Sequence, residues 1–359
     1  MGLTSMGLQL AAAVLALAAF AGAVWAWPRL AGRGVPPVLG RVGVLAACQV
    51  LTLVALGLAV NTYYGFYGSW ADLLGTDTGT AQIVMAGAGA GLRVLDSRPV
   101  AGGRVEQVVM PGPSTGLSEE AYVFLPSAYF KDRQARFPAI LALTGYPGDP
   151  RNLMTRMDLP GRLAKAVAQR QVKPAILVMM RPSVVLPRDT ECVDVPGGPQ
   201  VQTYFAQDVK RDVTAHYRVA PGRESWGILG GSTGGYCALK LAMSHSDAFS
   251  VAVSLSGYFK TIIDGTTGDL FRGDKALEQR NDLMWRLANL PAPPVKVLVT
   301  SSRKGESDYA ATERFLAAVR PPMQASSLIL PSGGHNFNTW NRELPQALPW
   351  LAQQLTVPA

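Results

Sequence analysis

The segment Gly230-Gly231-Ser232-Thr233-Gly234-Gly235 constrains the fold of this 359-residue chain more than any other. It has the form G-x-S-x-G, follows a short apolar run at 226–229 and precedes a helical stretch at 235–245. A strand that turns abruptly into a helix strains the backbone of the serine, and only glycine, here Gly230 and Gly234, leaves room on either side. The alternative, a phosphate-binding loop, would need a Gly-Lys-Ser/Thr sequence, which does not follow. The segment therefore predicts a nucleophile elbow with Ser232 exposed at the start of a helix.

From residue 104 onward, short apolar runs typical of strands alternate with amphipathic stretches typical of helices. The expected strands are 104–110, 121–125, 139–143, 175–180, 225–229, 250–255 and 295–300. The expected helices are 153–171, 202–216, 235–245, 309–320 and 342–355. This alternation implies an α/β fold, with a mainly parallel sheet covered by helices on both faces.

The first part of the chain has a different composition. Two apolar runs, about 8–27 and 42–60, are each close to the roughly 20 residues that span a bilayer as a helix. We expect residues 1–71 to form a membrane anchor of two transmembrane helices, 72–103 a linker and 104–359 the catalytic domain. A secretory signal peptide, the alternative for the first run, would have a basic start and a shorter apolar core.

The loop between the two runs carries Arg29, Arg33 and Arg41, whereas no basic residue precedes the first run. The positive-inside rule therefore places this loop in the cytoplasm and the catalytic domain on the extracytoplasmic side of the cell membrane. In an oxidising compartment Cys192 and Cys237 could form a disulfide, although two separately buried thiols explain the sequence equally well.

The charge and composition of the chain indicate which kinds of partner it can bind. The formal net charge is +8, but the basic residues are scattered and no zinc-finger, RNP or basic-helix pattern occurs. We therefore expect no nucleic-acid partner, and the basic exterior indicates affinity for an anionic membrane. Three dispersed histidines and no Cys-x-x-Cys motif predict neither a metal nor a cofactor. The acidic residues Asp189, Glu191 and Asp194 are interpreted as a solvated loop rather than as a calcium site.

A serine hydroxyl is a poor nucleophile without a base, and that base should be a histidine on a loop after a late strand. His335 meets this requirement, because it follows the apolar run 327–330 and precedes the last helix. His216 ends a helix before the elbow and His245 ends the elbow helix, where capping or surface roles suffice. His335 is therefore the predicted general base.

The third member of a triad should be an acid between the serine and the histidine, after the penultimate strand. Glu306 and Asp308 both lie on the loop that follows the expected strand 295–300. Asp308 has a competing role as N-cap of the helix that begins at Tyr309. Glu306 is therefore the first choice and Asp308 the alternative.

An oxyanion needs two backbone N–H donors, one from the residue after the nucleophile and one from a loop after an early strand. Thr233 supplies the first. Tyr146, in Thr144-Gly145-Tyr146-Pro147-Gly148, is the choice for the second, because a proline has no N–H to donate. Tyr258, Phe337 and Trp340 flank the predicted site and are candidates for a substrate pocket.

Several of these segments together resemble the putative-esterase family, which includes esterase D-type enzymes and actinobacterial mycolyltransferases. The resemblance rests on 120–148, the elbow, Ser254-Leu255-Ser256-Gly257-Tyr258 and Gly333-Gly334-His335-Asn336, and it covers nearly all of 104–355. It implies an α/β-hydrolase fold with a serine, a histidine, an acid and two backbone donors in the roles given above. Thr144 departs from the family pattern, because a histidine or aspartate often precedes the oxyanion glycine.

These observations predict an extracytoplasmic, membrane-anchored serine esterase that acts on carboxylic esters, with lipid or cell-envelope esters as substrates, through an acyl-enzyme. Two alternatives remain. If a sugar or lipid hydroxyl resolves the acyl-enzyme, the protein is an envelope acyltransferase of the mycolyltransferase type. The other alternative is a catalytically silent binding module, against which the intact serine, histidine and candidate acid argue.

Overall fold

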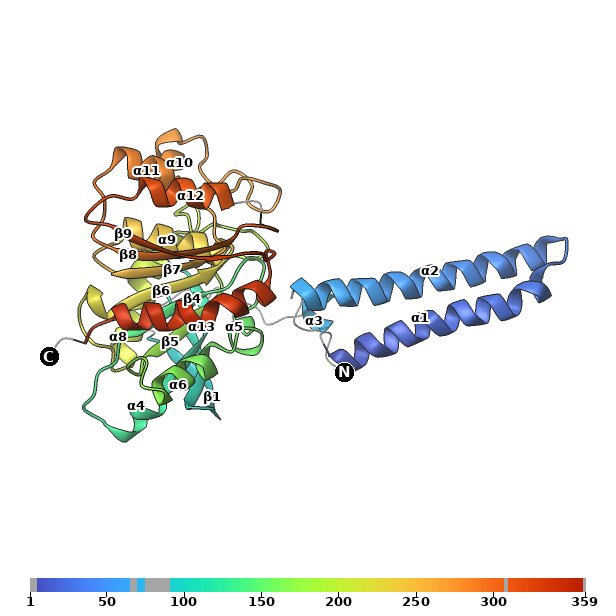
Figure 1. Ribbon diagram of the computed structural model, residues 1–359, viewed down its shortest axis with the longest axis horizontal. Coiled ribbons are helices and arrows are strands. Elements are labelled where there is room, and N and C mark those ends of the chain that lie inside the picture. The colour runs from blue at the N-terminus through green and yellow to red at the C-terminus, as the bar shows by residue number, and fades with distance from the viewer. Residues whose placement is uncertain (1–4, 65–69, 75–90, 307–308, 358–359) are drawn as a thin grey trace. The chain divides into compact units, whose positions relative to one another are not determined.

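The computed structural model describes residues 5–64, 70–74, 91–306 and 309–357. The chain divides into two compact units, Met1–Thr80 and Ala81–Ala359. The first unit is helical, and the second is built on a single nine-stranded sheet (Figure 1).

The helices of the first unit are α1 (Met6–Ala26), the short 3-10 helix η1 (Trp27–Leu30), α2 (Val35–Tyr64) and α3 (Trp70–Leu73). The spans Met6–Leu30 and Val35–Thr62 are both long and apolar enough to cross a membrane. They include the expected spans 8–27 and 42–60. The second helix begins earlier than expected, at Val35, because prolines are tolerated in the first turn of a helix.

α1 and α2 form an antiparallel pair, in which the Gln9 side chain near the start of α1 donates a hydrogen bond to Thr62 Oγ1 near the end of α2. Most apolar side chains of the pair are exposed, for example Leu17 at 70% and Val24 at 76%. A helix that is apolar on all sides is typical of a membrane-spanning segment or a protein core.

The sheet of the second unit has the order β1-β2-β3-β5-β4-β6-β7-β8-β9. β1, β2, β3 and β5 pair antiparallel in that order, and the strands from β5 to β9 pair parallel. The strands are β1 (Arg93–Val100), β2 (Gly103–Pro111), β3 (Ser118–Pro126), β4 (Ala139–Leu143), β5 (Ile176–Met180), β6 (Trp226–Gly231), β7 (Val251–Leu255), β8 (Lys296–Ser302) and β9 (Gln324–Leu330). The α/β fold class expected from the sequence is confirmed.

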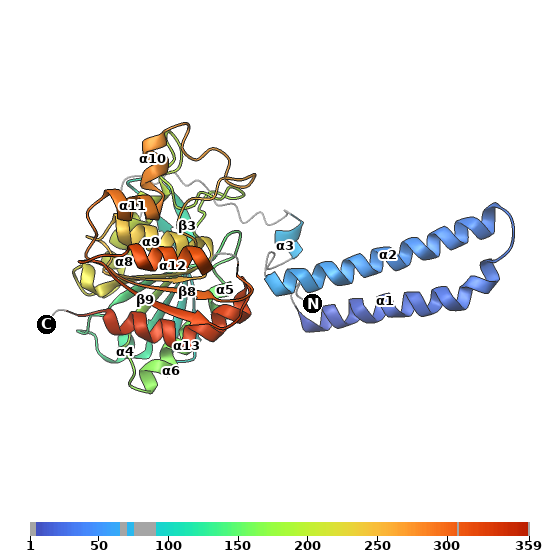
Figure 2. The ribbon, with the colours of Figure 1, turned by 45° about the horizontal axis from the view of Figure 1, so that its top comes forward.

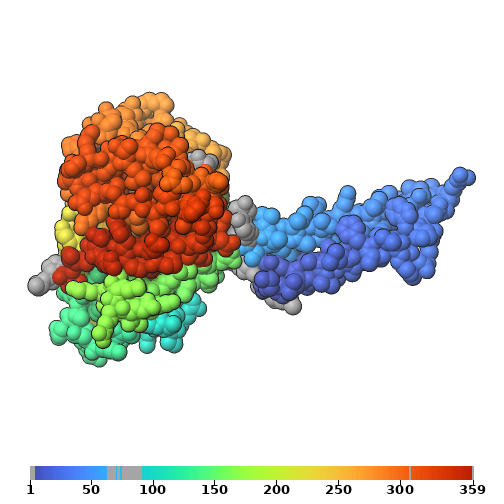
Figure 3. All heavy atoms as spheres, viewed as in Figure 1, coloured from blue at the N-terminus to red at the C-terminus, as the bar shows by residue number. Residues whose placement is uncertain are grey.

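The helices of this unit are α4 (Ser127–Lys131), α5 (Asn152–Thr155), α6 (Leu159–Ala168), α7 (Val201–Thr203), the π-helix η2 (Tyr204–Val209), α8 (Lys210–His216), η3 (Arg223–Ser225), α9 (Thr233–Ser244), α10 (Lys275–Arg280), α11 (Leu283–Asn289), α12 (Tyr309–Ala318) and α13 (Phe337–Gln354). Helices cover both faces of the sheet (Figure 2). α8, α9, α11 and α12 pack on one face and α5, α6 and α13 on the other. In Figure 3, α13, in red, lies directly against the green residues of α6.

The sheet begins earlier than the sequence pattern indicates. β1 lies inside residues 72–103, which were expected to form a linker, and it pairs with β2 across a turn at Ala101 and Gly102. Seven of its eight residues are exposed. The hydrogen bonds of the hairpin therefore hold β1 in place without an apolar face, and such a strand leaves no alternating pattern in the sequence.

The carboxyl ends of the parallel strands lie along one edge of the sheet. Leu143 of β4 pairs with Gly230 of β6, and Gly231 pairs with Leu255 of β7. The loops after these strands therefore meet, and this edge is where open α/β sheets bind their ligands.

Candidate active site

Ser232 lies between β6 and α9 in a strained backbone conformation, with φ 56° and ψ −123°. A positive φ is costly for a non-glycine residue and persists only where the surroundings hold it. Here the Ser232 N–H donates to the carbonyl oxygen of Leu255 at the end of β7, and the Ser232 carbonyl accepts from Tyr236 in α9. The elbow therefore projects the serine side chain from the carboxyl edge of the sheet.

Gly230 and Gly234, which flank the serine, leave no room for a side chain. A Cβ atom on Gly230 would lie 2.1 Å from the carbonyl oxygen of Gly234, and one on Gly234 would lie 2.2 Å from that of Thr144. Backbone atoms cannot yield at such distances without moving a strand. This close approach of β4, β6 and α9 is the physical reason for the G-x-S-x-G spacing.

His335 lies on the loop between β9 and α13, 103 residues beyond the serine, and its Nε2 is 2.7 Å from Ser232 Oγ. The ring packs edge-to-face against Trp340, with 5.6 Å between ring centroids. Asn336 ends the loop as the N-cap of α13, where its side chain accepts from the N–H groups of Asn338 and Thr339. The imidazole is thus held within hydrogen-bonding distance of the Ser232 hydroxyl.

The loop after β8 contacts the histidine loop directly, because the Gly333 N–H donates to the carbonyl oxygen of Lys304. On this loop, Glu306 Oε2 accepts from Ser301 Oγ and from the Ser302 N–H, both at 3.0 Å. The carboxylate of Glu306 is thereby tied to the end of β8. Asp308, the alternative acid, lies outside the described residues.

A buried acid of α13, Glu343, lies close to this loop. Glu343 of α13 accepts from Thr300 Oγ1 at 2.7 Å, and burial raises its pKa to about 8, with the negative charge of Glu306 adding to the shift. Glu306 therefore lies close enough to Glu343 for their charges to interact.

The loop after β4 lies over the serine. A Cβ on Gly145 would be 3.1 Å from Ser232 Cβ, so the backbone at Gly145 and Tyr146 is close to Ser232. The turn is closed by a hydrogen bond from Gly148 N–H to the carbonyl oxygen of Gly145, and the Tyr146 hydroxyl donates to the carbonyl oxygen of Pro187. Thr233, the other predicted donor, is the first residue of α9, where backbone N–H groups have no partner within the helix.

The three candidate pocket residues are largely enclosed. Phe337 and Trp340 are 9% and 5% exposed, and both lie in α13 on the side that packs into the core. The Trp340 ring makes the edge-to-face contact with His335 described above. Tyr258 stacks on Tyr236, with 5.1 Å between ring centroids. Its hydroxyl is hydrogen bonded to Glu191 and Thr233 inside the protein.

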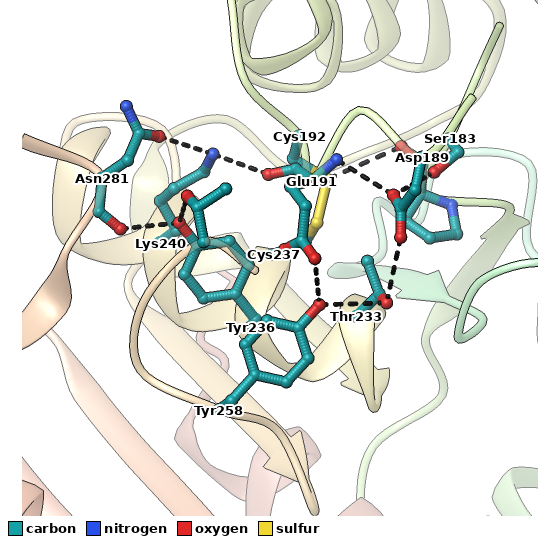
Figure 4. The surroundings of a disulfide bond; sticks show 12 residues. Ser183, Asp189, Glu191, Cys192, Thr233, Tyr236, Cys237, Lys240, Tyr258 and Asn281 are labelled. Carbon is teal, nitrogen blue, oxygen red and sulfur yellow. Dashed lines mark hydrogen bonds between the residues drawn. A yellow bond between two sulfur atoms is a disulfide. The ribbon is translucent and has the colours of Figure 1, made fainter. Parts of the chain in front are cut away.

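The interpretation of one acidic segment as solvated is wrong. Asp189 and Glu191 were interpreted as part of a solvated loop, but they are only 4% and 1% exposed. They lie beside the disulfide that joins Cys192 to Cys237 of α9, and Lys240 of the same helix is also buried there (Figure 4). Lys240 was the available signal, because a lysine in a helix that is otherwise apolar needs buried polar partners. Among the described residues, no group of three or more His, Cys, Asp and Glu side chains is placed to hold a metal ion.

Comparison with known proteins agrees with this architecture. Residues 113–351, more than half of the chain, match the model of the family described as putative esterase. An uncharacterized protein of Corynebacterium glutamicum is 23% identical over 346 residues, which cover 90% of this chain and 80% of that protein.

The fold is also similar to that of solved structures. A ferulic acid esterase superposes with a TM-score of 0.60 at 19% identity, covering 70% of this chain and 98% of the esterase. An S-formylglutathione hydrolase of Agrobacterium tumefaciens gives 0.61 at 14% identity, covering 74% and 100%. A fluorophosphonate-binding serine hydrolase of Staphylococcus aureus gives 0.56 at 18% identity, covering 70% and 98%. With its α/β-hydrolase architecture and this family match, the chain belongs to the putative-esterase family of serine hydrolases.

Proposed function

We propose that this protein is a membrane-anchored serine esterase in which Ser232 is the nucleophile and His335 the general base. The 2.7 Å contact between His335 Nε2 and Ser232 Oγ is the observation that carries the proposal, because a base must lie within hydrogen-bonding reach of the proton that it takes. Ser232 is half-buried and His335 is exposed, so an ester and water can both reach the pair.

The reaction proceeds in two balanced steps. His335 takes the Ser232 proton while Oγ attacks the ester carbonyl carbon, and the tetrahedral intermediate expels the alcohol, which receives that proton from His335. Water then attacks the acyl-enzyme, giving a proton to His335, and the collapse of the second intermediate returns the proton to Ser232 and releases the acid. Backbone N–H groups of Thr233 and Tyr146 hold the oxyanion in both steps.

Water as the acyl acceptor distinguishes an esterase from an acyltransferase. With a p-nitrophenyl ester as donor, we expect the amount of free acid to equal that of p-nitrophenol, whether or not glycerol or trehalose is present. Release of p-nitrophenol measures how much acyl-enzyme forms, and chromatography of the products shows whether its acyl group goes to water or to the added hydroxyl compound. An acyl-glycerol or acyl-trehalose product, with a matching deficit of free acid, would contradict the esterase assignment and support the transferase.

The anchor and its orientation form a separate part of the proposal. Two apolar helices and the arginines of their connecting loop, Arg29, Arg33 and Arg41, support an anchor whose loop is cytoplasmic. The disulfide between Cys192 and Cys237 supports an oxidising, extracytoplasmic location of the catalytic unit.

Thiol labelling of intact cells tests this orientation. In a Cys48→Ser background, a cysteine that replaces the exposed Gly32 should resist a membrane-impermeant maleimide until the cells are opened. A matched cysteine at the exposed Arg133 of the catalytic unit should react in intact cells. Labelling of the cysteine at position 32 in intact cells would contradict the proposed orientation and place the loop outside the cell.

A further inference from the structure

The loop after β5 brings two acidic side chains into the interior beside the elbow. Asp189 Oδ1 accepts from Ser183 Oγ at 2.6 Å and from the Glu191 N–H at 3.0 Å. Burial raises the pKa of Glu191 to about 8, with the neighbouring charge of Asp189 contributing, and burial also raises the pKa of Asp189. Interior carboxyl groups are costly unless the fold gives them hydrogen-bond partners.

Hydrogen bonds connect both acids to Thr233, the residue after the nucleophile. The Tyr258 hydroxyl is 2.6 Å from Glu191 Oε1 and 3.1 Å from Thr233 Oγ1, and Thr233 Oγ1 is 3.5 Å from Asp189 Oδ2 (Figure 4). The Thr233 side chain is thereby held on both sides, by Tyr258 from the loop after β7 and by Asp189 from the loop after β5.

One arrangement of protons gives every hydroxyl of this chain of hydrogen bonds a partner. Tyr258 has one hydroxyl proton, so it can bind both Glu191 and Thr233 only if one of them donates to it. Because burial raises the pKa of Glu191 to about 8, its carboxyl group can carry a proton near neutral pH and donate it to the Tyr258 oxygen. Tyr258 then donates to Thr233 Oγ1, which donates to Asp189, and every hydroxyl in the chain has a partner.

Two further links fix the acidic loop to α9. Cys192, next to Glu191, is bonded to Cys237, which lies one turn beyond Thr233 on the helix. Lys240 Nζ, completely buried, donates to the Glu191 carbonyl oxygen and to Asn281 Oδ1, both at 2.8 Å. Glu191 and Thr233 are therefore held in one rigid frame, because both are attached to the same helix.

We propose that Tyr258 and Glu191 are positioning residues that hold Thr233 so that its backbone N–H points at the substrate oxyanion. The proposal rests on the proposed function, in which Thr233 is an oxyanion donor. Donors stabilise a developing oxyanion only when they are oriented before the reaction, and small displacements at such a site lower the rate strongly. The hydrogen bonds of the Thr233 hydroxyl hold its side chain in place, and a fixed side chain limits the displacement of the backbone N–H of the same residue.

Tyr258→Phe tests the proposal, because it removes one hydroxyl and keeps the ring that stacks on Tyr236. We expect kcat for a p-nitrophenyl ester to fall about tenfold, less than the 10²–10³-fold lost when a donor itself is removed, with KM changed by less than about twofold. Tyr236→Phe is the matched control: it removes a buried hydroxyl bonded to Thr261 and Asn281, away from Thr233. It should keep kcat within about twofold of the wild-type value.

Two additional variants separate positioning from packing. Thr233→Val keeps the backbone N–H and the shape of the side chain but loses the hydroxyl, and combining it with Tyr258→Phe should lower kcat no further than either change alone. Glu191→Gln, whose amide can donate to the Tyr258 oxygen, should keep most of the activity, whereas Glu191→Leu should lose as much as Tyr258→Phe.

Thermal unfolding of each variant establishes that the protein is folded at the assay temperature. A wild-type kcat in Tyr258→Phe, or additive losses in the double variant, would overturn the positioning role while leaving the serine esterase intact. A folded wild-type protein that neither hydrolyses esters nor reacts with a fluorophosphonate would overturn the proposed function and this inference with it.

Discussion

Replacing Ser232 with alanine is expected to lower kcat for ester hydrolysis by at least about 10⁴-fold, to the level supported by substrate binding and the oxyanion donors alone. Alanine keeps the Cβ atom at the strained backbone position, so the elbow and its hydrogen bonds to Leu255 and Tyr236 should persist. The variant removes only the nucleophilic oxygen. Initial rates of p-nitrophenol release, with active-site titration of the wild type, measure the loss.

His335→Ala should produce a loss of similar size, because the serine and its base act as one unit. The double variant Ser232→Ala/His335→Ala should therefore be no slower than either single variant. His245→Ala is the matched control, since His245 is hydrogen bonded to Gln202 at the far end of α9. Substantial turnover in Ser232→Ala, or independent losses from the two changes, would contradict the assigned roles.

One of the two variants Glu306→Gln and Asp308→Asn is expected to lower kcat by about 10³–10⁴-fold, whereas the other should lower it less than about tenfold. Glu306 is the first choice from the sequence. Its Oε2 atom accepts from Ser301 and Ser302 at the end of β8, whereas its Oε1 atom has no hydrogen-bond partner among the described residues. The proposed acid that orients His335 is therefore one of these two residues, with Glu306 the first choice and Asp308 the alternative.

The same ester assay on the two variants decides between the acids. Because asparagine and glutamine are nearly isosteric with the acids that they replace, both proteins should unfold at temperatures close to that of the wild type. If Glu306→Gln shows the larger loss in kcat, Glu306 is the acid, and if Asp308→Asn shows it, the alternative holds. Equal and small losses in both variants would contradict the assignment of the acid to this loop.

The elbow and its fold could be predicted because steric requirements leave a short local pattern. Gly230 and Gly234 are needed for the approach of β4, β6 and α9, and this requirement is visible in six consecutive residues. His335 could be found because it is a single histidine between the last strand and the last helix. The strands β4 to β8 are also visible as apolar runs, because they are buried on both faces.

Other features depend on contacts between distant residues and leave no local signal. β1 is almost wholly exposed and pairs with β2, so residues 93–100 lack the alternation of a half-buried strand. Asp189 and Glu191 are charged residues that resemble a solvated loop until Tyr258 and Thr233 are placed beside them. Glu306 and Asp308 are two residues apart on one loop, and spacing alone cannot choose between them.

The most direct test of the central claim is covalent labelling of the wild-type protein with a fluorophosphonate, followed by mass spectrometry of the intact protein and its peptides. The account predicts one adduct per chain, located on Ser232, with no adduct in Ser232→Ala and greatly slowed labelling in His335→Ala. A folded wild-type protein that remains unlabelled, or that carries the adduct on a different residue, would contradict the claim that Ser232 is the nucleophile of this hydrolase.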